Sequence, residues 1–320
     1  MPAIYAFNGD ADGLCALHQL RLSDPQPSVL ITGVKRDIEL LKRVPAGAGD
    51  RVTVLDVSFD VNRAALQPLL DAGAFVRWFD HHHAGEIPCH PHFEPHIDVS
   101  ADVCTSLLVD RALNGRYRSW AIAAAFGDGL KDVAKGLACK AALSPQQVEL
   151  LERLGTLLNY NAYGDAVDDL HFDPAELADQ MHAFSDPIEF VRASDAFATL
   201  AEGYRSDMTR ARALQPLCNA PGAKVVMLPD EAWARRAIGS LANELMQVEP
   251  DCGIAILSPK PAGGYTVSVR APACGRAPAD AFCRQFATGG GRRGAGGIND
   301  LPHSDLDRFN GLFERHFRVD

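Results

Sequence analysis

Ala3-Ile4-Tyr5-Ala6-Phe7, followed directly by Asn8-Gly9-Asp10-Ala11-Asp12-Gly13, is the stretch that decides the fold. The apolar run predicts a short buried strand, and side chains two residues apart on extended backbone point to the same side. Asp10 and Asp12 are therefore expected to face one cavity, while Gly9 and Gly13 allow a tight turn. Taken alone, such a pair more often marks a solvated turn, because Asp and Gly are common turn residues.

Three further acidic positions follow apolar runs in the same way. Asp56 and Asp80-His81-His82-His83 each end a run that predicts a strand, and Asp128 lies in a Gly-Asp-Gly turn after a run that predicts a buried helix. Open parallel α/β sheets bind ligands at the carboxyl ends of their strands. We therefore expect these residues to converge on one crevice, and their joint placement carries the prediction.

The residue types indicate divalent metal ions. Carboxylates with one or two imidazoles suit Mn²⁺ before Zn²⁺, whereas a structural zinc site usually has paired cysteines. The eight cysteines are scattered and no Cys-x-x-Cys occurs. Two ions roughly 3.5–4 Å apart can activate a water and clamp the attacking and leaving oxygens of a phosphoryl displacement. The sequence therefore predicts a phosphoesterase with two Mn²⁺ ions, for which Mg²⁺ or Co²⁺ are possible substitutes.

In chain order, these motifs resemble motifs I to IV of the DHH phosphoesterase superfamily, namely Asp10-Ala11-Asp12-Gly13, Asp56, Asp80-His81-His82 and Asp128. Some members have a His shortly before motif I, where this chain has Asn8, closer to the Asp-rich exonuclease pattern. The resemblance implies that Asp10 binds one metal ion and that Asp56 bridges the pair. It assigns the other ion to Asp12, His81 and Asp128.

Two catalytic roles complete the expected site. His82 is expected to hydrogen-bond a non-bridging phosphate oxygen as charge builds there. Asp80 is expected to orient His81 by contacting it without binding a metal ion itself.

A second block of sequence resembles the DHH-associated C-terminal domain. It comprises residues 265–270, residues 279–286 and a glycine-rich run in which Arg292 stands where that domain usually has His. Consecutive glycines allow backbone N–H groups to converge on phosphate oxygens, and guanidinium groups bind them bidentately. A glycine run alone is more often a mobile loop. The expected substrate-binding residues are Arg270, Gly289, Gly290, Gly291 and Arg292.

The alternation of apolar runs with helix-length segments predicts an α/β fold with a parallel sheet. Strands are expected at 3–7, 29–34, 52–57 and 75–79, and helices at 14–22, 37–43 and 61–72. Residues 102–185 are expected to be mainly helical. Apolar residues spaced from Phe197 to Leu214 predict a long helix that stops at Pro216. Strands at 224–228, 253–257 and 265–269 predict a smaller α/β domain.

We therefore expect a DHH catalytic domain over 1–190, a helical linker over 191–218 and a DHH-associated substrate-binding domain over 219–320. The active site is expected in the cleft between the two domains. The length of 320 residues agrees with two domains.

Composition limits the partners that the protein can bind and indicates where in the cell it is located. The formal net charge of −10 argues against broad contact with long duplex nucleic acid, which depends on a basic surface. No apolar run approaches the roughly 18 residues of a membrane span. The start of the chain lacks the basic segment of a secretory signal, so a cytoplasmic protein with reduced cysteines is expected.

Three other features have a plain structural explanation. Six histidines between residues 81 and 96 could form a zinc site with Cys89, but neighbouring prolines favour an irregular loop. The aromatic residues of segment 159–164 could stack on a base, but helix packing is the favoured explanation. Buried packing is the default for all eight cysteines.

The resemblance leaves the substrate open. The chain looks most like compact superfamily members that hydrolyse linear dinucleotides such as pGpG, so we expect a diribonucleotide or very short oligoribonucleotide to be cleaved to mononucleotides. One alternative is an exopolyphosphatase or 3′-phosphoadenosine-5′-phosphate phosphatase. The other is a non-catalytic nucleotide sensor, in which Asn8 and Arg292 mark lost activity. A homodimer is possible.

Overall fold

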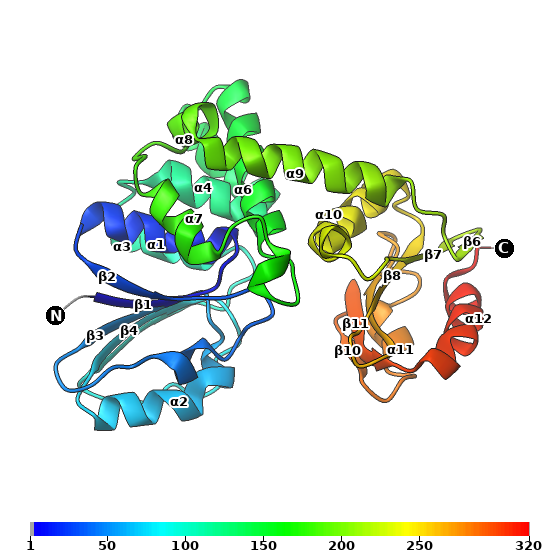
Figure 1. Cartoon of the computed structure of the whole chain (residues 1–320), viewed down its shortest axis with the longest axis horizontal. Coiled ribbons are helices and arrows are strands. Elements are labelled where there is room, and N and C mark those ends of the chain that lie inside the picture. Colours follow the sequence, from blue (N-terminus) through cyan, green and yellow to red (C-terminus); the bar gives the residue numbers. More distant parts are fainter. Residues whose placement is uncertain (1–2, 320) are drawn as a thin grey trace. The chain divides into compact units, whose positions relative to one another are not determined.

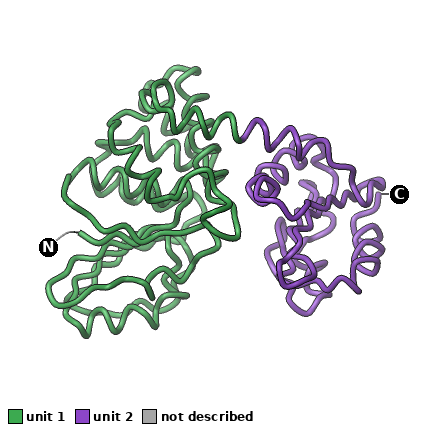
Figure 2. The backbone as a smooth tube through the Cα atoms, in the orientation of Figure 1, with its two compact units in different colours: residues 1–203 green, residues 204–320 purple. Residues whose placement is uncertain are grey.

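The computed structural model describes residues 3–319. Its chain divides into two compact units, residues 1–203 and residues 204–320 (Figure 2). The boundary lies inside the helix α9 (Asp195–Arg212). Each unit has its own sheet and its own hydrophobic core.

The first unit is built on a five-stranded, entirely parallel sheet with the strand order β2-β1-β3-β4-β5. Helices α1 (Ala11–Ser23) and α2 (Phe59–Asp71) lie on opposite faces of this sheet (Figure 1). Val52, Val54 and Trp78 belong to the core on the α2 face. The strands are β1 (Ala3–Phe7), β2 (Ser28–Ile31), β3 (Arg51–Leu55), β4 (Phe75–Asp80) and β5 (Phe93–Ile97).

Two elements of the first unit differ from the sequence prediction. The histidine-rich segment was expected to be an irregular loop, but its last part forms the edge strand β5, which contains Pro95. Proline is tolerated there because an edge strand has one side without ladder partners. The helix expected at 37–43 is only a 3₁₀ turn, η1 (Leu40–Arg43). The side chain of Asn62 bonds the Leu41 N–H and the Ile38 carbonyl, which holds this segment in a non-helical path.

Helices fill most of the remainder of the first unit, as predicted. They are α3 (Thr105–Ala112), α4 (Arg118–Gly127), α5 (Lys131–Lys140), α6 (Pro145–Asn161), η2 (Val167–Asp169), α7 (Pro174–Met181) and α8 (Pro187–Ala193). Helix α4 is central, because every residue from Trp120 to Phe126 is buried. Helices α4 and α6 approach closely at Gly155, where an added Cβ would lie 2.0 Å from the Ala123 carbonyl oxygen. This contact supports the turn that carries Asp128.

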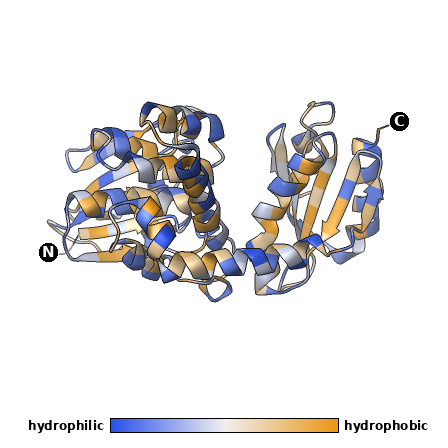
Figure 3. Cartoon of the chain, turned by 90° about the horizontal axis from the view of Figure 1, so that it is seen from above, coloured by the Kyte–Doolittle hydropathy of each residue, from blue (hydrophilic) through white to orange (hydrophobic). Residues whose placement is uncertain are grey.

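The second unit contains a six-stranded mixed sheet with the order β10-β11-β9-β8-β7-β6. Only β7 and β8 pair in parallel. The strands of this sheet carry many hydrophobic residues (Figure 3), and helix α12 adds Phe309, Phe313 and Phe317 to the core. The elements are β6 (Cys218–Ala220), β7 (Ala223–Met227), α10 (Ala232–Val248), β8 (Gly253–Pro259), β9 (Tyr265–Arg270), α11 (Ala279–Cys283), β10 (Gly289–Gly291), β11 (Ala295–Leu301), η3 (His303–Asp305) and α12 (Leu306–Phe317).

The predicted fold class, an α/β protein with an N-terminal parallel sheet and a smaller second α/β unit, is confirmed. Among residues 3–319, no helix combines the length and hydropathy that crossing a membrane requires. The default of buried packing is wrong for Cys89, Cys139 and Cys274, which are exposed.

Candidate metal centre

The carboxyl ends of β1, β3 and β4 bring the acidic motifs of the first unit together around His81. Its Nε2 lies 3.5 Å from Asp56 Oδ1, 3.9 Å from Asp128 Oδ2 and 4.0 Å from Asp12 Oδ2. Asp10, Asp56, His81, His82 and Asp128 line a cavity of about 240 Å³. His83, the third histidine of the run, is exposed and lies outside this cavity lining.

Two overlapping groups have the geometry to hold a cation. One consists of Asp12, His81 and Asp128, and the other consists of Asp56, His81 and His82. Within each group the candidate ligand atoms all lie within 4.8 Å of one another. Because the groups share His81, two cations held by them would be neighbours.

Asp12 is held in place by the start of helix α3. The backbone N–H of Thr105 donates to Asp12 Oδ2 at 2.7 Å, and the N–H of Ser106 donates to Oδ1 at 2.7 Å. A helix N-terminus favours a carboxylate in this position. Burial nevertheless raises the pKa of Asp12, and the neighbouring charge of Asp10 adds to that increase, while His81 opposes it.

Asp56 adopts a left-handed backbone conformation, with φ of 55°. Few residues other than glycine adopt this region, although Asp and Asn tolerate it better than most. The Asp56 N–H donates to the Phe79 carbonyl at 3.0 Å, and the Thr105 hydroxyl lies 3.4 Å from Asp56 Oδ1. The side chain is 4% exposed. Burial, and then repulsion by Asp10 and Asp12, raise the pKa of Asp56 well above its ordinary value.

Asp128 caps the carboxyl end of α4, and burial followed by repulsion from Asp12 and Asp10 raises its pKa to about 7. Asp12, Asp56 and Asp128 thus share an excess of negative charge that the protein groups around them do not balance. Such a cluster suits divalent cations, which would restore the charge balance and lower the pKa of each carboxyl. The residues present therefore fit a metal centre.

Asp10 lies outside both groups. Its Oδ1 caps helix α1 by accepting from the N–H groups of Asp12, at 3.0 Å, and Gly13, at 3.2 Å, while its Oδ2 is paired with Lys35. Burial would raise the pKa of Asp10, but the Lys35 ammonium outweighs it, so the pKa is lowered. Sequence reasoning missed Lys35. It follows the strand expected at 29–34, so the rule that placed ligands at strand ends could have identified it.

Asn159 extends this network toward the Asp128 turn. Lys35 Nζ lies 3.3 Å from Asn159 Oδ1, and Asn159 Nδ2 donates to the Gly127 carbonyl at 3.0 Å. Asn159 links the carboxylate of motif I to the residue that precedes Asp128.

Asp80 contacts a different histidine from the one expected. Its Oδ1 pairs with His82 Nδ1 at 2.7 Å, and its Oδ2 accepts the Phe59 N–H at 3.2 Å. The expectation that Asp80 orients His81 is therefore wrong. The reason is local, because residues two apart at the end of a strand point the same way while the residue between them points away. The bond to Asp80 raises the pKa of His82.

The expected substrate-binding residues belong to the second unit. Gly289–Gly291 form the edge strand β10, which pairs antiparallel with β11, rather than a loop. An added Cβ at Gly289 would lie 1.8 Å from the Cys283 carbonyl oxygen, so glycine is needed there for packing. Arg292 follows in the hairpin turn. Within residues 3–319, neither Arg270 nor Arg292 forms an ion pair.

Comparison with known proteins shows which solved structures this chain resembles in fold. No protein-family model matches the chain, and no curated protein matches it. Solved structures do match, and at 16–18% identity the likeness is one of fold, which agrees with the fold expected from the motifs.

Three solved structures illustrate the match. An exonuclease RecJ bound to manganese has a TM-score of 0.57 at 18% identity, covering 100% of this chain and 91% of that one. RecJ from Thermus thermophilus in complex with Mn²⁺ has a TM-score of 0.56 at 18% identity, covering 98% of this chain and 51% of that one. The pGpG-specific phosphodiesterase PggH from Vibrio cholerae has a TM-score of 0.59 at 16% identity, with 98% of each chain covered.

Proposed function

We propose that this protein is a phosphodiesterase that uses two divalent metal ions, with Mn²⁺ preferred and Mg²⁺ or Co²⁺ as possible substitutes. The observation that carries the proposal is the pair of ligand groups sharing His81, set among buried carboxylates whose pKa values are raised. The similarity in fold to RecJ structures that hold manganese supports the choice of metal.

In the proposed mechanism, Asp12, His81 and Asp128 would hold one cation, and Asp56 would supply oxygen atoms to the other. The two ions would activate a water and stabilise the charge on the leaving oxygen. Asp56 Oδ1 lies 3.5 Å from Nε2 of His81, the residue that the two groups share, so Asp56 is close to both groups. Asp10, expected to be a ligand from the resemblance, acts in this proposal through Lys35 and through the cap of α1.

Asp80 positions His82 for contact with the substrate. The short bond to Asp80 fixes the imidazole and favours its protonated form, so a ring N–H is available to a phosphate oxygen. Charge-assisted hydrogen bonds of this kind stabilise the charge that develops on a phosphoryl group. His82 lines the cavity and is partly exposed, as a residue that meets a substrate must be.

As substrate, we propose a linear dinucleotide such as pGpG or a very short oligoribonucleotide, cleaved to mononucleotides. The match over nearly the whole length of PggH supports this choice. The net charge of −10 disfavours binding of long duplex nucleic acid as a substrate. In this proposal residues 1–190 carry the catalytic centre, and Arg270 and Arg292 of residues 219–320 bind the substrate phosphate.

A substrate panel tests the proposal. Purified protein with Mn²⁺ is offered pGpG, longer oligoribonucleotides, cyclic di-GMP, polyphosphate and 3′-phosphoadenosine-5′-phosphate, and the products are separated by chromatography. We expect conversion of pGpG to GMP, slower cleavage of longer oligomers, and no product when Mn²⁺ is withheld. Preferential turnover of polyphosphate or the bisphosphate would replace the dinucleotide proposal, and binding without turnover throughout would favour a nucleotide sensor.

A further inference from the structure

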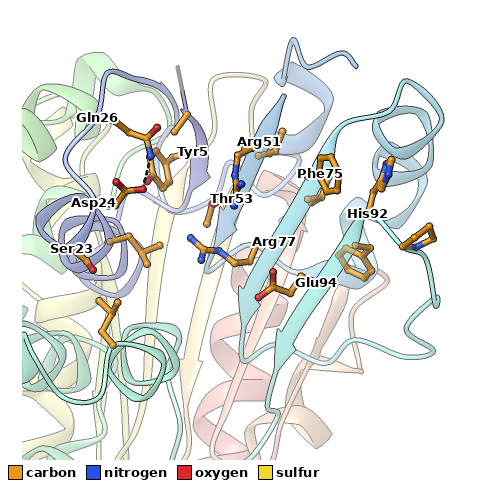
Figure 4. A pocket seen from close by; sticks show the side chains of 17 residues that line it. Tyr5, Ser23, Asp24, Gln26, Arg51, Thr53, Phe75, Arg77, His92 and Glu94 are labelled. Atoms are coloured by element: carbon orange, nitrogen blue, oxygen red, sulfur yellow. Dashed lines mark hydrogen bonds between the residues drawn. The ribbon is translucent and has the colours of Figure 1, made fainter. Parts of the chain in front are cut away.

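A second cavity, of about 490 Å³, lies at the opposite end of the first sheet from the metal centre. It is lined by residues at or near the amino ends of the strands, among them Ala3, Arg51 and Phe75 (Figure 4). The metal-centre residues follow the carboxyl ends of the same strands. A five-residue strand is roughly 16 Å long, so the two cavities are separate.

The floor of this cavity is one face of the sheet. Tyr5, Thr53 and Arg77 are register partners on β1, β3 and β4, so their side chains stand in a row on that face. Arg51 is two residues before Thr53 and shares the face. Figure 4 shows the guanidinium groups of Arg51 and Arg77 turned toward Thr53, with Tyr5 beside them.

The donors in this row have no partner among residues 3–319. Neither Arg51 nor Arg77 forms an ion pair or a side-chain hydrogen bond there, and the hydroxyls of Tyr5 and Thr53 form none either. Burial raises the pKa of Tyr5, so its hydroxyl keeps its proton. The cavity also contains two carboxylates: Asp24 accepts from Gln26 at 2.8 Å, and Glu94, the register partner of Arg77 on β5, lies 2.6 Å from His96.

Aromatic rings hold Arg77 and border the cavity. The Arg77 guanidinium carbon lies 5.4 Å from the centre of the Phe79 ring, which orients the group without using its N–H donors. At the rim, the Phe75 and His92 rings lie 4.1 Å apart, and Phe75 is 47% exposed. An aromatic pair at the rim beside cationic donors suits a ligand that has a flat ring and an oxyanion.

We propose that this cavity is a second binding site, which takes a small ligand composed of a flat ring joined to an oxyanion, either phosphate or carboxylate. The oxyanion binds between Arg51 and Arg77, with the Tyr5 and Thr53 hydroxyls as further donors. The ring stacks against Phe75 and His92. The cavity volume lies within the range of roughly 300–1,000 Å³ that is usual for small-molecule sites.

Calorimetric titration of the full chain in EDTA tests the proposal independently of catalysis, because chelation keeps divalent cations out of the metal centre. The probes are GMP, benzoate and inorganic phosphate. We expect GMP or benzoate to bind, and whichever binds identifies the oxyanion as phosphate or carboxylate. Combining Arg51→Gln and Arg77→Gln should weaken that binding at least about tenfold.

The matched control is Arg116→Gln, because Arg116 also lies beside an aromatic ring, 5.2 Å from that of Tyr117, but does not line the cavity. Phe75→Ala provides a second variant, which should weaken the ring-bearing probe and leave inorganic phosphate unaffected. The proposal is overturned if neither GMP nor benzoate binds, if inorganic phosphate binds as tightly as they do, or if the double variant binds like wild type. Thermal unfolding establishes that each variant is folded.

Discussion

At the scale of the residue, Asp56 is the side chain on which the metal centre depends most. It is buried, repelled by Asp10 and Asp12, and held in a left-handed conformation. Asn keeps the shape and tolerates that conformation, but it removes the charge. The substitution Asp56→Asn therefore separates the function of the carboxylate from its place in the fold.

We expect Asp56→Asn to lower Mn²⁺-dependent turnover of pGpG more than about 100-fold, as loss of a metal-site residue does. In EDTA the same variant should unfold at a higher temperature than wild type, because the repulsion among the buried carboxylates is relieved. Turnover assays and thermal unfolding on one preparation provide both readouts. Unchanged turnover at saturating Mn²⁺ would show that Asp56 has no part in the centre.

Lys35 provides a second residue-scale prediction. Lys35→Gln removes the ammonium that balances Asp10, whose side chain is 3% exposed, and it weakens the link through Asn159. In EDTA we expect the free energy of unfolding to fall by about 1–3 kcal/mol, the usual cost of leaving a buried polar group without its partner. Chemical denaturation measures this change.

The neighbouring residue is the control for Lys35. Arg36 pairs with Asp165 at 3.1 Å, and both side chains are well exposed. Exposed pairs contribute about 0–1 kcal/mol, so Arg36→Gln should have little effect on unfolding. Equal effects of the two substitutions would mean that the Lys35 pair has no special role.

The acidic and histidine residues of the centre could be found from sequence because each follows an apolar run. Lys35 follows the strand expected at 29–34 and could have been found by the same rule, but its bond to Asn159 could not, since it joins positions 124 residues apart. Asp80 was assigned to His81, although side chains two residues apart at a strand end share one side, which pairs Asp80 with His82. Long-range contacts are thus the information that motif spacing lacks.

At the scale of the element, the close approach of α4 and α6 positions the Asp128 turn. Gly155→Ala would place a Cβ 2.0 Å from the Ala123 carbonyl oxygen, so the helices must separate. We expect destabilisation of about 1–3 kcal/mol, typical of overpacking, together with weaker Mn²⁺ binding. Denaturation and metal titration measure the two effects.

Gly136 offers the matched control for Gly155. It lies in helix α5, and an added Cβ there meets nothing within 4 Å. Gly136→Ala should therefore stabilise the protein by about 0.5–1 kcal/mol, because Gly is unfavourable within helices. Similar destabilisation by both substitutions would contradict the packing argument.

The helices and strands were predicted correctly where the hydrophobic periodicity was strong. The prediction failed where tertiary contacts determine the local structure. The strands β1, β3 and β4 were expected from their apolar runs. The strand β5 was missed because Pro95 argues against a strand unless its edge position is known. The glycine run was expected to be an anion-binding loop, yet Gly289–Gly291 pair with β11 as the strand β10.

At the scale of the whole molecule, the shared charge of the metal centre sets a pH dependence. Burial and mutual repulsion raise the pKa values of Asp12, Asp56 and Asp128, the last to about 7. Their ordinary value is about 3.9, so the folded protein holds more protons than the unfolded chain between these limits. Stability in EDTA should therefore fall as the pH rises from about 4 to about 7.

Mn²⁺ should reverse this trend, because its ligands must lose their protons to bind. We expect the increase in unfolding temperature caused by Mn²⁺ to be larger at pH 8 than at pH 6. Thermal unfolding at both pH values, with and without Mn²⁺, measures it. A Mn²⁺ effect that is the same at both pH values would contradict the raised carboxyl pKa values.

The central claim is that two divalent cations bind side by side where the strands of the first sheet end. Anomalous diffraction from crystals grown with Mn²⁺ and recorded at the manganese absorption edge tests it most directly. The account predicts two adjacent peaks, one within reach of Asp12, His81 and Asp128 and the other within reach of Asp56, His81 and His82. Peaks located elsewhere, or no peak among these residues at saturating Mn²⁺, would contradict it.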